Sequence, residues 1–367
     1  MAPIRLGVVG LSAQGSWASR SHLKHLQQSA DYTITALQNS SKQAAQAAVE
    51  KYNLPADTTA CYDDIESLVH DANVDMVIVS VKVPEHYALI KPALEARKDI
   101  FVEWPLAANL QQAEELTALA TAHKVRTMVG LQARQNPSIR RAREMVSAGK
   151  LGEILGTTML GSGMIFGPTT TPGMLYTLPL KHGANLITIP AGHAMDALCW
   201  VLGELADVQA TLANNRPELL LVDGSTSESK PKPVPKTAHD YMALTGHLVK
   251  GGGVATVVYQ GGTSVTGKDF YWEINGTKGS LVLEADKGHV QMFHPTLKFV
   301  KAEPGAKLDE VLVDRADDLS YNVGLAWDAF VDKGPGSVTT FEDALLRHKM
   351  IDAIYRSNEK GTRETYI

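Results

Sequence analysis

A short turn near residue 10 has the residue types that bind phosphate groups. The turn reads Gly10-Leu11-Ser12-Ala13-Gln14-Gly15 and lies between an apolar run and a helix-like segment that begins at Ser16. Small residues let the backbone approach a pyrophosphate, and the start of the next helix offers unpaired N–H groups. Ser12 replaces the middle glycine of that pattern but keeps a small side chain with a hydroxyl donor. The turn predicts a dinucleotide site, and an ordinary strand-to-helix turn is the alternative. The predicted contacts here are Gly10, Ser12, Ala13, Gln14, Gly15 and Trp17.

The residues after the second predicted strand bear on which dinucleotide fits. A site selective for NAD has an Asp or Glu here that hydrogen-bonds the ribose hydroxyls. This chain reads Gln38-Asn39-Ser40-Ser41-Lys42, so no carboxylate is present to repel a 2′-phosphate. Hydroxyl groups and a lysine can bind that phosphate. The sequence favours NADP, with NAD as the alternative, and a polar loop without any ligand explains the same residues. The predicted contacts are Asn39, Ser40, Ser41 and Lys42.

The elements that position these turns alternate between strand and helix over the first 131 residues. Apolar, β-rich runs predict strands at 4–9, 32–37, 76–81, 100–102 and 127–131. Helical patterns between them predict helices at 16–26, 42–52, 63–70, 86–96 and 110–123. Such alternation gives parallel strands joined by right-handed crossovers. The pattern predicts a dinucleotide-binding Rossmann domain over residues 1–129.

The chain changes character after residue 131. A polar helix is predicted at 138–148, and later strands at 244–249, 254–259, 271–275, 280–284 and 290–293. The first two of these flank the turn Gly251-Gly252-Gly253, which predicts a hairpin. The polar stretch 216–240 is predicted as a mobile loop at the sheet edge, and a last helix at 341–358 is predicted to pack across both domains. The fold class is therefore α/β: an N-terminal Rossmann parallel sheet and a C-terminal α/β domain, residues 130–340, built on an open, mostly antiparallel sheet, followed by residues 341–367.

Composition excludes several classes of function. Thirty-five Lys and Arg against forty Asp and Glu give a net charge of −5, with no basic block for a nucleic-acid backbone. No apolar run approaches the roughly 20 residues that span a bilayer. The two cysteines, Cys61 and Cys199, fit neither a metal-binding spacing nor a disulfide framework. We expect a soluble, cytoplasmic protein that binds no metal, nucleic acid or membrane.

Four further segments carry a resemblance to a known family. They are Val-Lys-Val-Pro-Glu-His at 81–86, Phe-Val-Glu-Trp-Pro-Leu at 101–106, Gly-His-Ala-Met-Asp at 192–196 and Gly-Thr-Lys-Gly at 276–279. Their order and spacing resemble the glucose-fructose oxidoreductase, inositol dehydrogenase and MocA family over nearly the whole chain. The turn at 10–17, Leu-Gln-Ala-Arg at 131–134 and Val-Pro-Lys-Thr at 234–237 are most similar to its fungal branch, which includes the yeast repressor of galactose genes.

The resemblance implies further cofactor contacts and a departure from the family pattern. Members place a Glu-Lys-Pro segment near the nicotinamide; here Glu103 and Pro105 match, but Trp104 occupies the lysine position. The family's Asp-x-x-x-His keeps His193, whereas Ile189 replaces the aspartate. An indole cannot exchange protons, so Trp104 can only pack, stack or donate one hydrogen bond. The Trp104–Pro105 peptide bond is expected to be cis. The implied cofactor contacts are Val81, Val83, Pro84, His86, Glu103, Trp104 and Arg134.

Hydride transfer also needs a group that moves the hydroxyl proton. The candidates are His193, Tyr176, Lys181 and His182. His193 is favoured because an ordinary imidazole titrates near neutral pH and the resemblance places it beside the substrate. The structural alternatives are a hydrogen-bonded helix start for His193 and an exposed turn for Lys181-His182.

Two functions follow from these patterns. The first is an NADP(H)-dependent oxidoreductase that acts on a small hydroxyl or carbonyl compound, either sugar-like or a secondary-metabolite intermediate. The second is a non-catalytic NAD(P)-sensing regulator that binds a protein partner and could work in the nucleus. The missing proton-handling groups favour the regulator, whereas the absence of long insertions favours the enzyme. In this family a second subunit covers the outer face of the C-terminal sheet, so a homodimer is expected.

Overall fold

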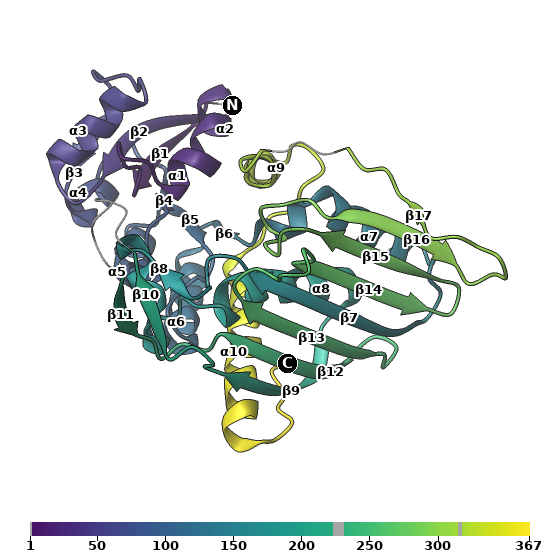
Figure 1. Cartoon of the computed structure of the whole chain (residues 1–367). Helices are drawn as coiled ribbons and strands as arrows, with labels where there is room; N and C mark the ends of the chain where they lie inside the picture. The colour runs from purple at the N-terminus through teal and green to yellow at the C-terminus, as the bar shows by residue number, and fades with distance from the viewer. Residues whose placement is uncertain (1, 223–230, 315–317) are drawn as a thin grey trace. The chain divides into compact units, whose positions relative to one another are not determined.

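The computed structural model describes residues 2–222, 231–314 and 318–367, which form two compact units. The first unit comprises residues 1–131 and 318–345, and the second comprises residues 132–317 and 346–367. Figure 1 labels the elements of both units along the chain. The predicted boundaries at 129 and 340 remain a prediction, but residues 318–340 are grouped with the first unit and not with the second.

The first unit is built on a six-stranded parallel sheet in the order β3-β2-β1-β4-β5-β6. Its strands are β1 (Ile4–Val9), β2 (Tyr32–Gln38), β3 (Ala60–Tyr62), β4 (Met76–Val79), β5 (Asp99–Glu103) and β6 (Thr127–Gly130). Its helices are α1 (Trp17–Ser21), α2 (Leu23–Gln28), α3 (Lys42–Lys51), α4 (Ile65–Val69), α5 (Val83–Glu95), α6 (Leu110–His123) and α9 (Tyr321–Phe330). The strand order reverses between β1 and β4, where such sheets bind ligands. The predicted Rossmann sheet is confirmed.

The helix α9 belongs to the core of this first unit. Val323, Trp327 and Phe330 pack with Phe101 and Met128 of the parallel sheet, and Trp327 is fully buried. A tryptophan that packs in this core contributes several kcal/mol to stability, of the order of 3–5 by substitution data. This packing explains why residues 318–340 lie in the first unit, although the sequence predicts them in the second domain.

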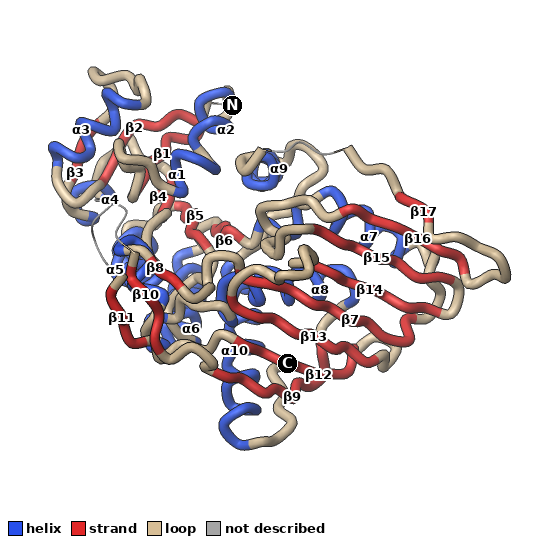
Figure 2. The backbone as a smooth tube through the Cα atoms, viewed as in Figure 1, coloured by secondary structure: helices blue, strands red, loops and turns tan. Residues whose placement is uncertain are grey.

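The second unit is built on an eight-stranded sheet in the order β17-β16-β15-β14-β7-β13-β12-β9. Its strands are β7 (Ile154–Gly163), β9 (Leu205–Ala213), β12 (Tyr241–Leu248), β13 (Val254–Gly261), β14 (Phe270–Gly276), β15 (Gly279–Ala285), β16 (Thr296–Lys301) and β17 (Asp309–Glu310). Neighbouring strands are antiparallel except β13 and β7. Figure 2 shows these strands side by side. The predicted open, mostly antiparallel sheet and the hairpin at 244–259 are confirmed.

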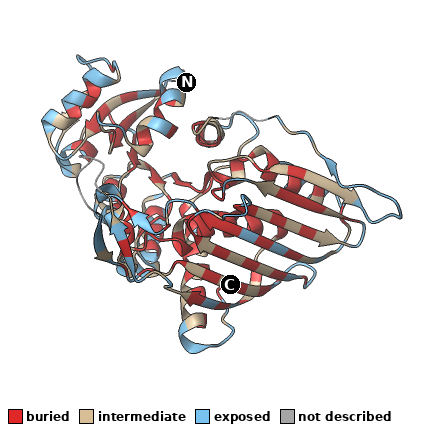
Figure 3. Ribbon diagram, in the orientation of Figure 1, coloured by how far each residue is buried: buried red, intermediate tan, exposed pale blue. Residues whose placement is uncertain are grey.

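One face of the eight-stranded sheet is buried in the core of the second unit. Buried residues alternate with more exposed ones along β7 and β13 (Figure 3), the pattern of a sheet with one covered face. The helices of this unit are α7 (Pro137–Ser147), α8 (Gly192–Leu202) and most of α10 (Phe341–Lys360), and short helical turns are η1 (Gln132–Gln135), η2 (Pro172–Thr177), η3 (Leu180–His182) and η4 (Ile187–Ala191). The helix α10 begins among residues of the first unit and ends among those of the second. Its predicted packing across both remains a prediction.

The polar stretch at 216–240 is not simply a loop. A third, three-stranded sheet has the order β11-β10-β8 and includes β8 (Thr169–Thr170), β10 (Glu218–Leu221) and β11 (Lys232–Pro235). The prediction of a loop is wrong for β10 and β11, because the two strands pair through their backbones although β11 is rich in Pro and Lys. The prediction for Ser225–Ser229 and Lys230 lies outside the described residues.

Two other predicted elements differ from the structure. Residues 290–293 form a turn, not a strand, because Met292 and Phe293 donate their N–H groups to the carbonyl of His289. The predicted helix at 16–26 is interrupted at His22, which lies between α1 and α2. The cis peptide bond between Trp104 and Pro105 is confirmed.

Candidate functional site

The turn after β1 can approach the end of β4 only because it begins with glycine. Gly10 has a φ of 96°, and a Cβ atom there would lie 2.3 Å from the carbonyl oxygen of Ser80. Gly15 has a φ of 92°, but its surroundings are open. The turn therefore lies at the point where the strand order reverses, with its backbone close to β4. This is where a dinucleotide pyrophosphate binds in such folds.

Ser12 and Ser16 hold the turn in shape. The Ser12 hydroxyl accepts a hydrogen bond from the N–H of Gln14 (3.2 Å), and the Ser12 carbonyl accepts from Gly15 N–H (3.0 Å) and from the hydroxyl of Tyr52 (2.7 Å). Ser16 caps α1 and exchanges hydrogen bonds with Ser19. The sequence did not predict roles for Ser16 and Tyr52. The N–H groups of Gln14, Gly15 and Ser16 are thus used within the turn.

The residues after β2 divide into structural and available groups. The Asn39 amide donates to the carbonyl of Leu11 (2.9 Å), and the Ser41 hydroxyl caps α3 by accepting from Ala44 N–H (3.1 Å). Ser40 and Lys42 are exposed, so they are available to a phosphate. The buried Oε1 atom of Gln38 has no hydrogen-bond partner among the described residues. The cofactor contacts predicted for Asn39, Ser40, Ser41 and Lys42 stay predictions.

His86 connects the ends of β4 and β5. Its ring is fully buried, with Nδ1 at 2.9 Å from the carbonyl oxygen of Pro105 and Nε2 at 3.2 Å from that of Val81. Burial lowers the pKa of His86, so the ring is neutral and donates to one of the two carbonyls. Val83 and Pro84 form the first turn of α5, which positions His86. The role of His86 seen here is to hold the segment that contains Trp104 and Pro105.

Glu103 and Trp104 end β5 in a buried environment. Trp104 is 4% exposed, and the Oε1 atom of Glu103 lies 2.5 Å from Nε2 of His22. The Nδ1 atom of His22 accepts a hydrogen bond from the indole of Trp327 (3.0 Å). The sequence assigned no role to His22 or Trp327. All four residues belong to the first unit.

In the second unit, His193 lies in the first turn of α8 and is buried. Burial, with a smaller contribution from the nearby His289, lowers the pKa of His193 to about 3. Its Nδ1 atom has no hydrogen-bond partner among the described residues, and neither has Nε2 of His289. Burial likewise lowers the pKa of His289 to about 4. At neutral pH His193 is therefore an uncharged hydrogen-bonding group.

Asp196 is held by arginine side chains in the second unit. Its carboxylate accepts two hydrogen bonds from Arg134, at 2.8 and 2.7 Å, and lies 3.7 Å from Nε of the buried Arg347. A bidentate pair of this kind fixes both groups. Arg134, predicted to contact the cofactor, is thus bound to Asp196, and the implied His193–Asp196 motif divides into a neutral histidine and an ion-paired carboxylate.

The other proton-handling candidates lie on η2 and η3. Burial raises the pKa of the Tyr176 hydroxyl above its ordinary value, which opposes its use as a base. The ring of His182 lies with Nδ1 2.9 Å from the Tyr176 carbonyl, and Lys181 is exposed. Lys181 and His182 thus lie in a short hydrogen-bonded turn, and a role in proton transfer for them stays a prediction.

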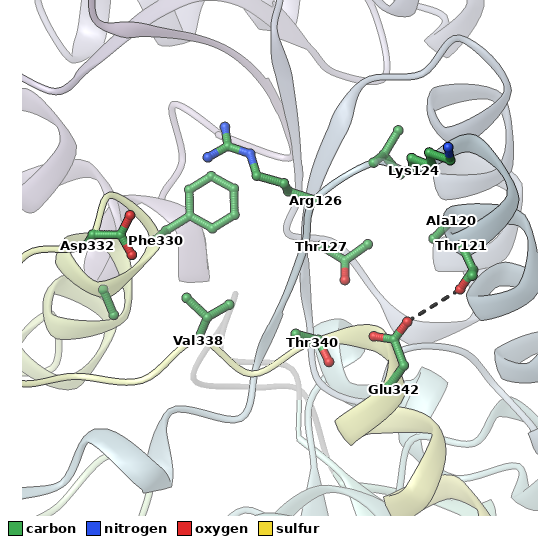
Figure 4. Close-up of a pocket in the computed structure, with 12 residues that line it drawn as sticks. Ala120, Thr121, Lys124, Arg126, Thr127, Phe330, Asp332, Val338, Thr340 and Glu342 are labelled. Atoms are coloured by element: carbon green, nitrogen blue, oxygen red, sulfur yellow. Dashed lines mark hydrogen bonds between the residues drawn. The ribbon is translucent and has the colours of Figure 1, made fainter. Parts of the chain in front are cut away.

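A pocket of about 410 Å³ lies elsewhere in the first unit (Figure 4). Its walls come from the end of α6, the residues before and at the start of β6, the end of α9 and the residues around the start of α10. They include Lys124, Arg126, Phe330, Val338 and Glu342. Because it lies at the amino end of β6, it is separate from the strand ends that carry Gly10, Glu103 and Trp104. Its Thr121 and Glu342 hydrogen-bond each other.

Some ligand classes find no site in the part of the chain that the structure describes. No group of three or more His, Cys, Asp or Glu side chains there could hold a metal ion, and both cysteines are free thiols. Among the same residues, no helix has the length and apolar character that crossing a membrane requires.

The parallel sheet, the turn at its switch point and the antiparallel second unit define a protein of the dinucleotide-binding oxidoreductase class. Residues 4–131 match the oxidoreductase family with an NAD-binding Rossmann fold, and residues 137–285 match the C-terminal domain of Gal80p. The chain belongs to this family, the glucose-fructose oxidoreductase, inositol dehydrogenase and MocA family, and to its Gal80-like branch.

The relatives include both an enzyme and regulators. The chain is 32% identical to the dehydrogenase aclE of Aspergillus oryzae over 99% of this chain and 98% of that protein. It is 34% identical to the galactose/lactose metabolism regulatory protein GAL80 of Kluyveromyces lactis over 83% of this chain and 68% of that protein. A crystal structure of a super-repressor mutant of Gal80p from Saccharomyces cerevisiae matches with a TM-score of 0.90 and 28% identity, covering 99% of this chain and 98% of that chain. The resemblance found in the sequence is confirmed.

Proposed function

We propose that this chain is an NADP(H)-dependent oxidoreductase that acts on a small hydroxyl or carbonyl compound by hydride transfer. The observation that carries the proposal is the Gly10 turn, whose backbone lies close to the end of β4 at the switch point of a parallel sheet. Similarity to a dehydrogenase over nearly the whole chain supports the enzymatic part. The substrate is either sugar-like or an intermediate of secondary metabolism.

Residues of the first unit supply the cofactor contacts. The turn at 10–17 would hold the pyrophosphate, Gln38 the ribose hydroxyls, and Ser40 with Lys42 the 2′-phosphate. Glu103 and Trp104 would face the nicotinamide half of the cofactor. A dinucleotide whose adenosine lies over β2 extends across the switch point toward β4 and β5. The bound nicotinamide would supply the hydride chemistry.

His193 is the residue proposed to contact the reacting hydroxyl. With a pKa near 3 it is neutral in the physiological range, so it can accept a hydrogen bond from a hydroxyl or donate one to a carbonyl. Holding an extra proton costs it free energy because the ring is buried. General acid–base catalysis is worth about 10²–10⁴ in rate, so we expect slow turnover with this weakly basic group.

The cofactor preference is tested with two charge reversals on α3. Lys42→Glu places a carboxylate where the 2′-phosphate is proposed to bind, whereas Lys51→Glu changes an equally exposed lysine at the other end of the helix. By calorimetry, Lys42→Glu should weaken NADP binding at least about tenfold, or about 1.4 kcal/mol, and leave NAD binding unchanged. Lys51→Glu should change neither. Equal loss in both variants, or no binding by the native chain, contradicts the proposal.

The second candidate function is a non-catalytic, NAD(P)-sensing regulator with a protein partner. It is favoured by Trp104 and Ile189 in the places of proton-handling groups, and by similarity to Gal80 regulators.

A panel of carbonyl compounds with NADPH separates the candidates. Turnover by the native chain that falls in His193→Ala supports the enzyme. Cofactor binding without turnover supports the regulator, as would activity gained only in Trp104→Lys. A cytoplasmic location for the enzyme, or a nuclear one for the regulator, is part of these proposals.

A further inference from the structure

His22 is the centre of a buried hydrogen-bonded chain in the first unit. Its ring is 2% exposed and meets the rings of Phe101 and Trp327 edge to face, with centroid distances of 4.8 and 5.9 Å. Its two nitrogens face different partners: Nδ1 faces the indole of Trp327 at 3.0 Å, and Nε2 faces the Glu103 carboxylate at 2.5 Å. The ring has no other place to turn.

The chemistry of tryptophan determines where the proton of His22 lies. An indole N–H can only donate, so Nδ1 of His22 must accept and carries no proton. The single proton of the neutral ring therefore lies on Nε2 and is donated to Oε1 of Glu103. A second proton on Nδ1 would require the Trp327 hydrogen bond to break. With a single ring proton, shared between Nε2 and the carboxylate, the pair of His22 and Glu103 carries one net negative charge.

The second carboxylate oxygen of Glu103 is also placed by the fold. Glu103 pairs across the sheet with Gly130 of β6, and a Cβ atom on Gly130 would lie 2.7 Å from Oε2. The carboxylate occupies the space that this glycine leaves, and its side chain is 13% exposed. His86 holds the next residues through the Pro105 carbonyl. The charge of Glu103 is therefore fixed at the carboxyl end of β5.

We infer that Trp327 and His22 are positioning residues that keep Glu103 as an uncompensated negative charge, and that this charge makes the chain bind oxidised nicotinamide dinucleotide more tightly than the reduced form. The inference rests on the proposed dinucleotide binding. The oxidised ring carries a positive charge and the reduced ring does not, so a fixed carboxylate on the ring side of the site attracts only the oxidised form. A protonated His22 would cancel that attraction.

The other titratable groups near the hydrogen bonds of Trp327, His22 and Glu103 do not place a second charge on His22. His86 on α5 faces Glu103, but burial lowers its pKa and keeps it neutral. His25 on α2 lies 3.2 Å from Asp328 of α9, and Lys24 pairs with Asp318. Tyr32 of β2 donates its hydroxyl to the Trp327 carbonyl at 2.7 Å, and burial raises its pKa. Among the described residues, the charge that faces His22 at hydrogen-bond distance is that of Glu103.

The experiment is calorimetric titration of the full chain with NADP⁺ and NADPH from pH 8 to pH 6. The native chain should bind NADP⁺ about tenfold more tightly, equivalent to about 1.4 kcal/mol, at every pH. Glu103→Gln should bring the ratio close to one throughout. Trp327→Phe frees Nδ1 to accept a proton beside the carboxylate, so its ratio should match the native one at pH 8 and fall toward one at pH 6. Trp272→Phe is the control, because that buried indole also donates one hydrogen bond (2.7 Å, to Thr157) but lies in the second unit.

The outcomes separate this inference from the proposed function. Equal affinity for both cofactor forms in the native chain overturns the inference and leaves dinucleotide binding intact. No binding of either form overturns the proposed function and the inference with it. A native-like, pH-independent ratio in Trp327→Phe overturns the role of Trp327. If Trp327→Phe fails to fold, an unchanged ratio in Glu103→Gln overturns the inference and a ratio near one supports it.

Discussion

At the scale of single residues, burial keeps His193 and His289 of the second unit uncharged at neutral pH. His193 was identified from the sequence because it lies in a recognisable motif. His289 and His22 were not, because their importance depends on burial and on partners far away in the chain; Trp327 is 305 residues from His22. No local pattern carries that information. The same holds for Asp196, whose arginine partners come from outside its motif.

The low pKa of His193 predicts how stability depends on pH. Unfolded histidine binds a proton near pH 6.5, whereas folded His193 binds one only near pH 3. Between these values the unfolded state holds more protons, so lowering the pH favours unfolding. From pH 7 to pH 5 this group should reduce the free energy of unfolding by about 2 kcal/mol.

Urea unfolding at the two pH values measures this effect. His193→Gln should lose about 2 kcal/mol less than the native chain on going from pH 7 to pH 5, since glutamine does not titrate. His70→Gln removes the exposed ring of the residue that follows α4 and serves as the control. An identical pH dependence in His193→Gln and the native chain would show that His193 titrates alike in both states.

At the scale of elements, local patterns predicted the alternating strands and helices of the first unit well. The runs that become β4 and β5 are apolar because both faces of a parallel sheet are covered. The pattern failed where pairing is non-local: β11 forms with β10 despite its Lys and Pro residues, and residues 290–293 look like a strand but are held as a turn. Asn136 accounts for that turn, because its amide donates to the carbonyls of Val290 and Phe293.

Removing this amide should loosen the 289–295 turn. Asn136→Ala leaves two carbonyls without their donor and removes the cap of α7, in which Asn136 accepts from Ser138 N–H at 3.0 Å. We expect a loss of about 3 kcal/mol in the free energy of unfolding, from about 1 kcal/mol for each hydrogen bond. The exposed Asn215→Ala is the control and should change stability by less than about 0.5 kcal/mol. Denaturant titration measures the free energy of unfolding of both variants. Equal stability of the two variants would contradict the role assigned to Asn136.

At the scale of the whole molecule, the sequence predicted the two kinds of sheet but not which segments join which unit. A second half with alternating polar and apolar strands predicts a sheet with one open face, and the structure has one. The assignment of α9 to the first unit could not be predicted, because its apolar residues fit either core. Only the contacts of Val323 and Trp327 with the parallel sheet decide it.

The open face of the eight-stranded sheet is the basis of the homodimer prediction. The strand register places Thr211, Ala243, Val258 and Leu160 in one uncharged row across β9, β12, β13 and β7. Leu160 is 46% exposed on this row, and Leu155 and Val254 are also exposed near the ends of their strands. An exposed row of this kind, made of uncharged side chains in the middle of an open sheet, favours association with a second copy. A stable dimer would bury about 1,000 Å² or more of this surface.

Sedimentation equilibrium tests the dimer directly. The native chain should sediment with twice the 39.6 kDa of one copy, whereas Leu160→Arg should sediment as a monomer, because the two-fold contact would bury unpaired positive charges. Val265→Arg places the same charge on a fully exposed residue between β13 and β14 and should remain dimeric. Far-ultraviolet circular dichroism checks that both variants keep the native fold. A monomeric native chain would contradict the dimer prediction, whereas a dimeric Leu160→Arg would place the contact on another surface. One substitution is enough to distinguish these cases, because an arginine at the centre of a self-complementary interface meets the same arginine of the second copy.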